Sequence, residues 1–286
     1  MKFFKYFFEY IFIKLLFILF RIIGYEKSSN LGEKIGKCIG PISRNNSLIL
    51  RNLEKSDIGK NKVDRQKIIH EMWGNYGRIL AEYPFLKSFS NSKLNKYIEI
   101  EGEEILNDLI NKKKNAVFIS WHFNNFELMA MYIEKVGINL AAVYRPLNNY
   151  FLNSTMVNIR KNFICKNQIK KGISGTRELL KLVKAGYSVA LMIDQRVSEG
   201  IKSQFFNEEA LTTTIPAQLV KKFNLDVIPI YIERKKNFYF KIYVKKPMIF
   251  DKDTPVEKIT YELNYLLKQM ILRNTSQWIW SHNRWK

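Results

Sequence analysis

The sequence predicts a layered α/β fold in which helices flank a largely parallel sheet, preceded by an N-terminal membrane-anchoring helix. Three observations support this fold class. From residue 97 onward, strand patterns and helix patterns alternate along the chain, which is typical of α/β layers. Three polar clusters each follow an expected strand: Trp121–Glu127, Tyr144–Asn149 and Asp194–Arg196. A long apolar run over residues 3–23 opens the chain.

Composition indicates one large domain with a strong preference for anionic partners. The chain has 286 residues and 47% hydrophobic content, and no Pro- or Gly-rich linker divides it. We therefore expect an anchor over residues 1–24 and a single domain over residues 25–286. The net charge is +21, which favours nucleic acid, an anionic membrane, a phosphorylated lipid or an acidic carrier protein. Cys38 and Cys165 lie far apart, so we expect two free thiols.

The apolar N-terminal run is long enough to cross a hydrocarbon core, which takes about 20 residues. It is not a clean spanning helix, because it carries four charged residues: Lys5, Glu9, Lys14 and Arg21. No small-residue cleavage site follows, which disfavours a signal peptide. We expect a spanning or deeply inserted anchor; the alternative is an apolar helix packed on the protein body.

The remaining elements follow from apolar spacing and from capping residues. The expected helices cover 46–56, 63–86, 103–111, about 124–136, 174 to about 185, the segment from Thr213 or Thr214 to 223, and 255–273. The expected strands cover 97–101, 116–120, 140–144, 188–193, 226–232 and 238–244. In parallel sheets, sites form at the carboxyl ends of the strands, so the three polar clusters are expected to converge.

The candidate chemistry centres on His122 and Glu127, five residues apart. On an ideal helix these residues would face different directions, so they can meet only at a strand-to-helix junction. A carboxylate that holds one imidazole nitrogen leaves the other free to take a proton from a hydroxyl group. No Ser or Cys lies in a nucleophile-elbow pattern, which disfavours a covalent acyl-enzyme. The alternative is a buried structural histidine and an exposed helix glutamate.

The other two histidines are expected to be structural. His70 lies among helical residues, and His282 lies in the segment Trp-Ser-His-Asn-Arg-Trp-Lys at the end of the chain. For His282, packing or capping is the first reading and a contact to a substrate phosphate the second. Since no further His or Cys cluster is present, we expect neither a metal site nor a cofactor.

Several segments, in order along the chain, resemble the late acyltransferases of lipid A biosynthesis, which share a His-x4-Asp/Glu motif with glycerolipid acyltransferases. The matching segments are Ser120–Glu127, Tyr144–Asn149, Asp194-Gln195, Phe205-Phe206, Ala210–Thr214, Val227–Ile230 and Trp278–Lys286. The resemblance implies an inner-membrane enzyme with its catalytic domain on the cytoplasmic face. Such an enzyme takes a fatty acyl group from acyl carrier protein and esterifies a hydroxyl group of a phosphorylated lipid A precursor.

By position, the resemblance implies that His122 is the general base and that Glu127 is its partner. It also implies that Arg145 contacts a substrate phosphate or the thioester oxygen. Asp194 and Gln195 would lie at the mouth of the site, and Thr213, in the Thr cluster, is a further substrate-binding candidate. The basic surface would dock acyl carrier protein, the phosphorylated glycolipid acceptor or the anionic membrane.

The sequence departs from the family pattern at three places, which affects acyl-chain length and acceptor more than the reaction. Arg196 follows the Asp-Gln pair where many members have an acidic residue, Gln204–Asn207 lacks the usual Pro and Gly, and Pro216 stands where Gly is common. One alternative is acyl transfer to another glycolipid or a phospholipid, with acyl-CoA as a possible donor. The other is a nucleic-acid-binding protein, which the lack of any nucleic-acid-binding motif disfavours.

Overall fold

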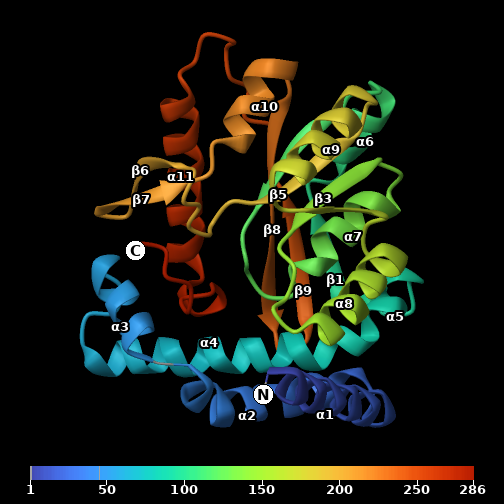
Figure 1. Ribbon diagram of the computed structural model, residues 1–286, viewed down its shortest axis with the longest axis vertical. Coiled ribbons are helices and arrows are strands. Elements are labelled where there is room, and N and C mark those ends of the chain that lie inside the picture. Colours follow the sequence, from blue (N-terminus) through green and yellow to red (C-terminus); the bar gives the residue numbers. More distant parts are fainter. Residues whose placement is uncertain (1, 45) are drawn as a thin grey trace.

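The computed structural model describes residues 2–44 and 46–286, and Figure 1 shows how the elements are arranged. The strands are β1 (Ile98–Glu101), β2 (Ala116–Ser120), β3 (Leu140–Tyr144), β4 (Asn167–Lys170), β5 (Ser188–Met192), β6 (Ile201–Phe205), β7 (Glu208–Thr212), β8 (Asp226–Lys236) and β9 (Tyr239–Val244). The α-helices are α1 (Lys2–Ile23), α2 (Tyr25–Ser43), α3 (Asn46–Lys55), α4 (Lys62–Glu82), α5 (Leu86–Ser90), α6 (Glu103–Asn111), α7 (Glu127–Lys135), α8 (Tyr150–Phe163), α9 (Ile173–Lys184), α10 (Ile215–Phe223) and α11 (Val256–Arg273).

The main sheet has seven strands in the order β1-β9-β8-β2-β5-β3-β4. Strand β2 runs parallel to its neighbours β5 and β8, and β3 runs parallel to β4 and β5. Strand β1 runs parallel to β9, whereas β8 and β9 are antiparallel because a short turn joins these consecutive strands. The predicted α/β fold with a largely parallel sheet is therefore confirmed, and the carboxyl ends of β2, β5, β3 and β4 lie at one edge.

The sheet separates two apolar cores. One core lies between the sheet and the helices α9, α10 and α11, and the other lies between the opposite face and the helices α6 and α7. Strand β2 is buried along its whole length, as expected for a central strand covered on both faces. Figure 1 shows α4 running across one end of the sheet, with α1 and α2 on its outer side.

Small residues bring α2 and α4 into close contact. A Cβ atom added at Gly77 would lie 1.9 Å from the carbonyl oxygen of Gly32, and one added at Gly36 would lie 2.2 Å from that of Trp73. Only glycine permits such an approach of two helix backbones. Helix α2 lies outside the helices expected from the sequence.

Helix α1 is long but does not match the predicted spanning anchor. Phe17 and Phe20 are buried, and the Phe17 ring stacks on Tyr83. The large apolar side chains exposed on α1 are Phe3, Phe4, Phe7, Phe8, Ile11, Phe12, Leu15, Ile18, Leu19 and Ile22. Across the described residues, every helix is too short or too polar to cross a membrane. The charged residues of α1 account for this result, so a spanning anchor is not supported.

Three further parts of the fold were not predicted. Helix α8 has no fully buried residue and β4 has only four residues, so neither gives a strong pattern. The β6–β7 hairpin turns at Phe206, whose φ of 57° is unusual for a bulky side chain, so no turn-forming glycine marks it. Helix α7 begins at Glu127 and not at Asn124, because Asn124 adopts a left-handed φ of 43°.

Candidate active site

His122 and Asp194 form a buried pair at the carboxyl ends of the neighbouring strands β2 and β5. Asp194 Oδ1 lies 2.8 Å from His122 Nδ1, and Asp194 Oδ2 accepts the backbone N–H of His122 at 2.9 Å. The indole N–H of Trp278 also donates to Oδ2, at 2.8 Å. The Asp194 side chain is fully buried, whereas 17% of the His122 side chain is exposed. The pair therefore has one open side, at the imidazole.

The surroundings of Asp194 keep its carboxyl group ionised. Burial alone would raise its pKa, but the His122 ring and the N–H donors of His122 and Trp278 outweigh burial and hold the pKa well below its usual range. An ionised Asp194 accepts the Nδ1 proton of His122, which fixes the tautomer with Nε2 unprotonated. His122 Nε2 can therefore act as a base.

Gln195 joins this pair to a second histidine. Its side-chain nitrogen Nε2 lies 3.3 Å from His122 Nε2 and 2.9 Å from His282 Nε2. The two imidazole rings lie 5.8 Å apart between centroids. Burial, the charge that His122 can carry, and the guanidinium groups of Arg44 and Arg145 lower the pKa of His282 to about 4, against the opposing effect of Asp194.

His282 was expected to be structural, and the structure instead places it beside His122. The final segment of the chain carries it there and is held by Asn52, whose side-chain N–H groups donate to the carbonyl oxygens of Trp280 and His282. This contact spans 230 residues of sequence, so no local pattern could have revealed it.

Glu127 has other partners, which corrects the expectation that it holds His122. Its Oε1 atom accepts from Arg160 Nε at 2.8 Å and from the hydroxyl group of Tyr83 at 3.0 Å, and Arg160 Nη2 completes an ion pair. Among the described residues no hydrogen bond joins His122 to Glu127. The reason is geometric: Glu127 opens α7 and faces α4 and α8, whereas His122 faces the end of β5.

The segment between His122 and Glu127 is fixed by the C-terminal part of the chain. Asn124 Nδ2 donates to Gln277 Oε1 at 2.6 Å and to the carbonyl oxygen of Ile232 at 3.1 Å. Phe123 forms an isolated antiparallel bridge with Trp278. Because Trp278 also contacts Asp194, the same C-terminal segment fixes both halves of the His122–Asp194 pair.

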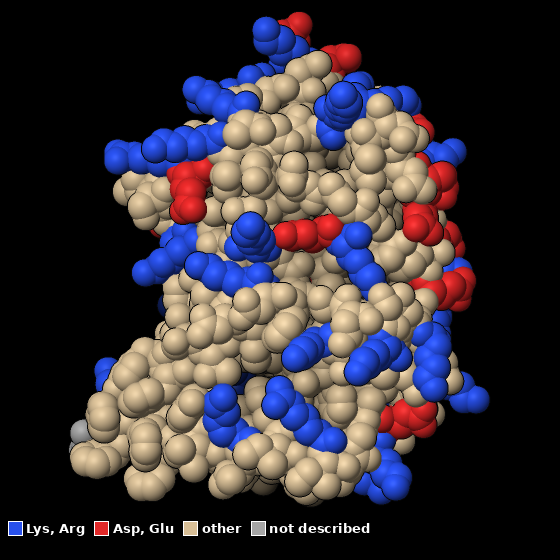
Figure 2. Space-filling view, turned by 90° about the vertical axis from the view of Figure 1, so that its right-hand side faces the viewer, with Lys and Arg blue, Asp and Glu red and all other residues tan. Residues whose placement is uncertain are grey.

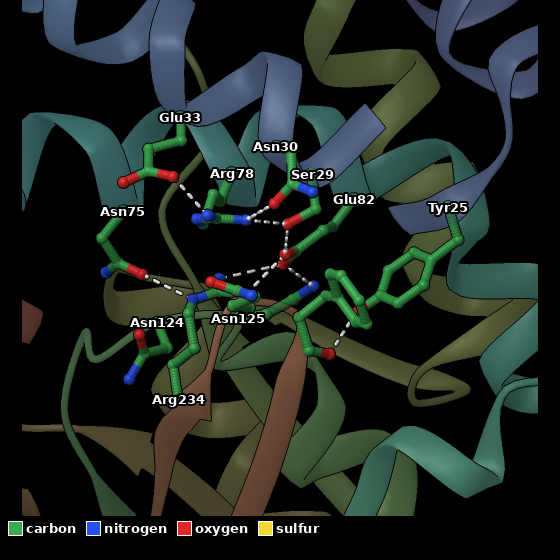
Figure 3. A network of polar contacts seen from close by, with 12 residues as sticks. Tyr25, Ser29, Asn30, Glu33, Asn75, Arg78, Glu82, Asn124, Asn125 and Arg234 are labelled. Atoms are coloured by element: carbon green, nitrogen blue, oxygen red, sulfur yellow. Dashed lines mark hydrogen bonds and ion pairs between the residues drawn. The ribbon is translucent and has the colours of Figure 1, made fainter. Parts of the chain in front are cut away.

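A buried polar network supports the segment from the side of α2 and α4 (Figure 3). The carboxylate of Glu82 is fully buried and accepts two N–H groups of Arg234, at 2.6 and 3.1 Å. Asn125 Nδ2 and the hydroxyl group of Ser29 also donate to Glu82, and Arg78 donates to Ser29. A buried carboxylate is tolerated only when it is paired and hydrogen-bonded in this way. The network therefore ties Asn125, next to the site, to α2, α4 and β8.

The remaining candidates lie further from the His122 ring or have other contacts. Arg145 is exposed after β3, close enough to His282 to contribute to its low pKa. Thr213 is partly buried, and its hydroxyl group accepts the backbone N–H of Ile215 at the start of α10. The structure thus brings together His122, Asp194 and Gln195, which come from two of the three polar clusters. No group of three or more His, Cys, Asp or Glu residues within the described ranges is placed to hold a metal ion.

Comparisons with known proteins all find lipid A biosynthesis acyltransferases. The family model described as bacterial lipid A biosynthesis acyltransferase matches residues 1–286. The chain is similar to the lipid A biosynthesis palmitoleoyltransferase of Escherichia coli, with 23% identity over 90% of this chain and 84% of that protein. It is also similar to the lipid A biosynthesis lauroyltransferase of E. coli, with 23% identity over 92% of this chain and 87% of that protein. A lipid A biosynthesis acyltransferase of Haemophilus influenzae shares 24% identity over 88% of this chain and 79% of that protein.

Proposed function

The chain belongs to the bacterial lipid A biosynthesis acyltransferase family and is an acyltransferase, and from this premise we propose its reaction. It transfers a fatty acyl group from acyl carrier protein to a hydroxyl group of a phosphorylated lipid A precursor. His122 is the general base, and Asp194 is the carboxylate that orients it. The observation that carries this proposal is the 2.8 Å contact between His122 Nδ1 and the buried Asp194, which keeps the ring proton on Nδ1 and leaves Nε2 unprotonated.

The reaction follows from this geometry without a covalent acyl-enzyme. His122 Nε2 takes the proton of the acceptor hydroxyl group while its oxygen bonds to the thioester carbonyl carbon. The electron pair of the carbonyl bond moves to the carbonyl oxygen. When the carbonyl re-forms, the carbon–sulfur bond breaks, and the imidazolium gives its proton to the departing thiolate. Asp194 stays ionised and stabilises the imidazolium throughout.

Exposed cations beside the site support anionic substrates. Arg145, Lys170 and Lys171 are exposed at the carboxyl ends of β3 and β4. Figure 2 shows a face on which Lys and Arg side chains are widely spread and exceed Asp and Glu. Such a surface attracts acidic carrier protein and lipid phosphates. In this proposal Arg145 contacts a phosphate of the acceptor or the thioester oxygen, and Thr213 lies at the edge of the acyl site.

The exposed apolar residues of α1 support contact with the inner membrane from the cytoplasmic side. They recur at the spacing of one helix face, covering an arc of about 180°. In a globular protein such a stripe would face the core, whereas here the core contacts come mainly from Phe17 and Phe20 on the other side. A helix of this kind lies in the membrane interface with its apolar face among the lipid chains. The active site would then open close to its lipid acceptor.

An assay with the purified full-length protein tests the reaction. Detergent-solubilised enzyme is given acyl thioesters of acyl carrier protein and a phosphorylated lipid A precursor, and the products are identified by mass spectrometry. We expect His122→Ala to lower kcat by at least about a thousandfold with little change in melting temperature. His70→Ala is the matched control, because His70 is exposed on α4, and it should retain full activity.

The same assay separates the alternatives. Full activity of the His122→Ala variant would exclude the proposed mechanism. Transfer from acyl-CoA but not from acyl carrier protein would replace the proposed donor. Transfer only to a different glycolipid or phospholipid would replace the proposed acceptor while keeping the chemistry.

A further inference from the structure

The amide of Gln195 determines the protonation states of the two histidines that it contacts. Its nitrogen Nε2 lies within hydrogen-bonding distance of Nε2 of both His122 and His282. An amide nitrogen only donates, so both ring nitrogens must accept. His122 then carries its proton on Nδ1, which agrees with the contact to Asp194. His282 carries its proton on Nδ1 as well.

The reverse orientation of the amide is incompatible with catalysis by His122. If Gln195 presented its oxygen, both Nε2 atoms would have to donate. His122 would then be an imidazolium, with protons on both ring nitrogens, and could not accept the proton of a hydroxyl group. An active site built on His122 as the base therefore requires the Gln195 nitrogen to face it.

The 3.3 Å hydrogen bond between Gln195 Nε2 and His122 Nε2 is lost during the reaction. Once His122 takes a proton, its Nε2 becomes a donor, and the Gln195 N–H group that faced it loses its acceptor. This N–H group can then donate to a new acceptor nearby. The carbonyl oxygen of the tetrahedral intermediate, which becomes negative, meets this need.

We propose that Gln195 donates to the negative oxygen of the tetrahedral intermediate, an inference that rests on the proposed function. In this proposal His282 is the positioning residue that fixes the Gln195 amide. The shorter contact, 2.9 Å to His282, remains when the reacting oxygen replaces His122 as the acceptor of the other N–H group. Without His282 the amide can rotate and present its oxygen to the negative charge. His282 suits this role because burial and nearby charges lower its pKa to about 4, so that the ring is neutral at physiological pH.

The position of His282 is itself rigidly set. Asn52 is buried and donates to the backbone oxygens of Trp280 and His282, while Arg44 donates to both oxygens of Ser281. These contacts hold the C-terminal segment against α3 and the end of α2. A rigid acceptor fixes the amide better than a mobile one, so these backbone contacts around His282 help to hold the Gln195 amide in one orientation.

A double-mutant cycle on the full-length enzyme tests the proposal. We expect Gln195→Ala to lower kcat about a hundredfold, the range found when one donor to a negative oxygen is removed, with KM nearly unchanged. His282→Ala should lower kcat by about tenfold or more, and His282→Gln, which retains an acceptor oxygen, should recover part of that loss. Because His282 acts through Gln195, His282→Ala should have no further effect in the Gln195→Ala background.

Several outcomes would overturn the proposal. Losses that multiply in the double variant would mean that His282 acts on its own, for example on a substrate phosphate. An increase of KM without a fall of kcat would assign both residues to substrate binding. A loss of activity accompanied by a marked fall of the melting temperature would assign them a structural role. The His122→Ala variant, measured in parallel, tells the two proposals apart: if it remains active, the proposed function fails for a reason that does not concern Gln195.

Discussion

The buried carboxylate of Asp194 lies 2.8 Å from Nδ1 of His122, although the two residues are 72 positions apart in the sequence. They meet because β2 and β5 are adjacent parallel strands whose carboxyl ends coincide, with Ser120 paired to Met192. The local His-x4-Glu spacing suggests Glu127 as the partner of His122. The carboxylate that contacts His122 is instead that of Asp194, which follows the neighbouring strand of the sheet.

Replacement of Trp278 by Phe should lower kcat about five- to tenfold. The change removes the indole N–H that donates to Asp194 Oδ2, and a hydrogen bond to a charged group contributes roughly 1.5–3 kcal/mol. With one N–H donor fewer, the pKa of Asp194 should rise. Trp280→Phe is the matched control, since this equally buried indole donates to the carbonyl oxygen of Thr275 instead. Equal kcat values of the two variants would contradict the prediction.

The Glu127–Arg160 pair should behave as a buried ion pair. Glu127→Gln or Arg160→Met alone leaves one group buried without its counter-charge, and we expect a loss of about 3–5 kcal/mol in the free energy of unfolding. The double variant removes both charges, so its melting temperature should lie above that of either single variant. Thermal unfolding of the three variants measures this. Additive losses would show that the two residues do not act as a pair.

The stability of the protein should fall in mild acid because of His282. Its pKa is lowered on folding from an ordinary 6.5 to about 4, so the folded state resists a proton that the unfolded state binds. The resulting stabilisation is complete above the ordinary pKa and is lost as the pH falls toward about 4. Between about pH 7 and about pH 4.5 the loss should be roughly 2 kcal/mol.

The His282→Gln variant isolates this effect, because glutamine does not titrate. Over the same pH range its melting temperature should fall by a few degrees less than that of the unmodified protein. Parallel curves would assign the acid sensitivity to other groups.

Apolar contact through α1 should show in vesicle binding. Phe8 and Phe12 are 67% and 58% exposed, and each ring moved from water into lipid contributes roughly 1.5–3 kcal/mol. We expect Phe8→Glu with Phe12→Glu to weaken binding to anionic vesicles at least about a hundredfold in a flotation assay. Tyr261→Glu, at an exposed aromatic position on α11, should bind as the unmodified protein does. Equal binding by all three proteins would exclude α1 as the contact.

The sheet and the position of the site could be predicted because their signals are local. Buried strands such as β2 are short apolar runs, and the polar residues after them must lie at one edge when the strands are parallel. Strand position singles out the clusters that contain His122, Asp194 and Gln195, and the resemblance to the family adds a role for each of these residues.

The pairing within the site could not be predicted from spacing. Glu127 and Asp194 are both acidic residues beside an apolar strand, and only the arrangement of α4 and α8 shows that Tyr83 and Arg160 engage Glu127. His282 depends on a contact between α3 and the chain terminus, which no local pattern encodes. Length and apolar content favour a spanning anchor over residues 3–23, but the four charged residues in the same stretch outweigh them, and no helix among the described residues is long and apolar enough to cross a membrane.

The role of Asp194 can be tested by comparing the acyl transfer rate of Asp194→Asn with that of the double variant Glu127→Gln/Arg160→Met. Asparagine keeps the size of the side chain but removes the charge that fixes the His122 tautomer, so we expect kcat to fall by about a thousandfold or more. The double variant leaves the His122–Asp194 pair untouched and should retain kcat within about tenfold of the unmodified enzyme. An active Asp194→Asn variant together with a folded but inactive double variant would exclude Asp194 as the partner of His122 and assign that role to Glu127.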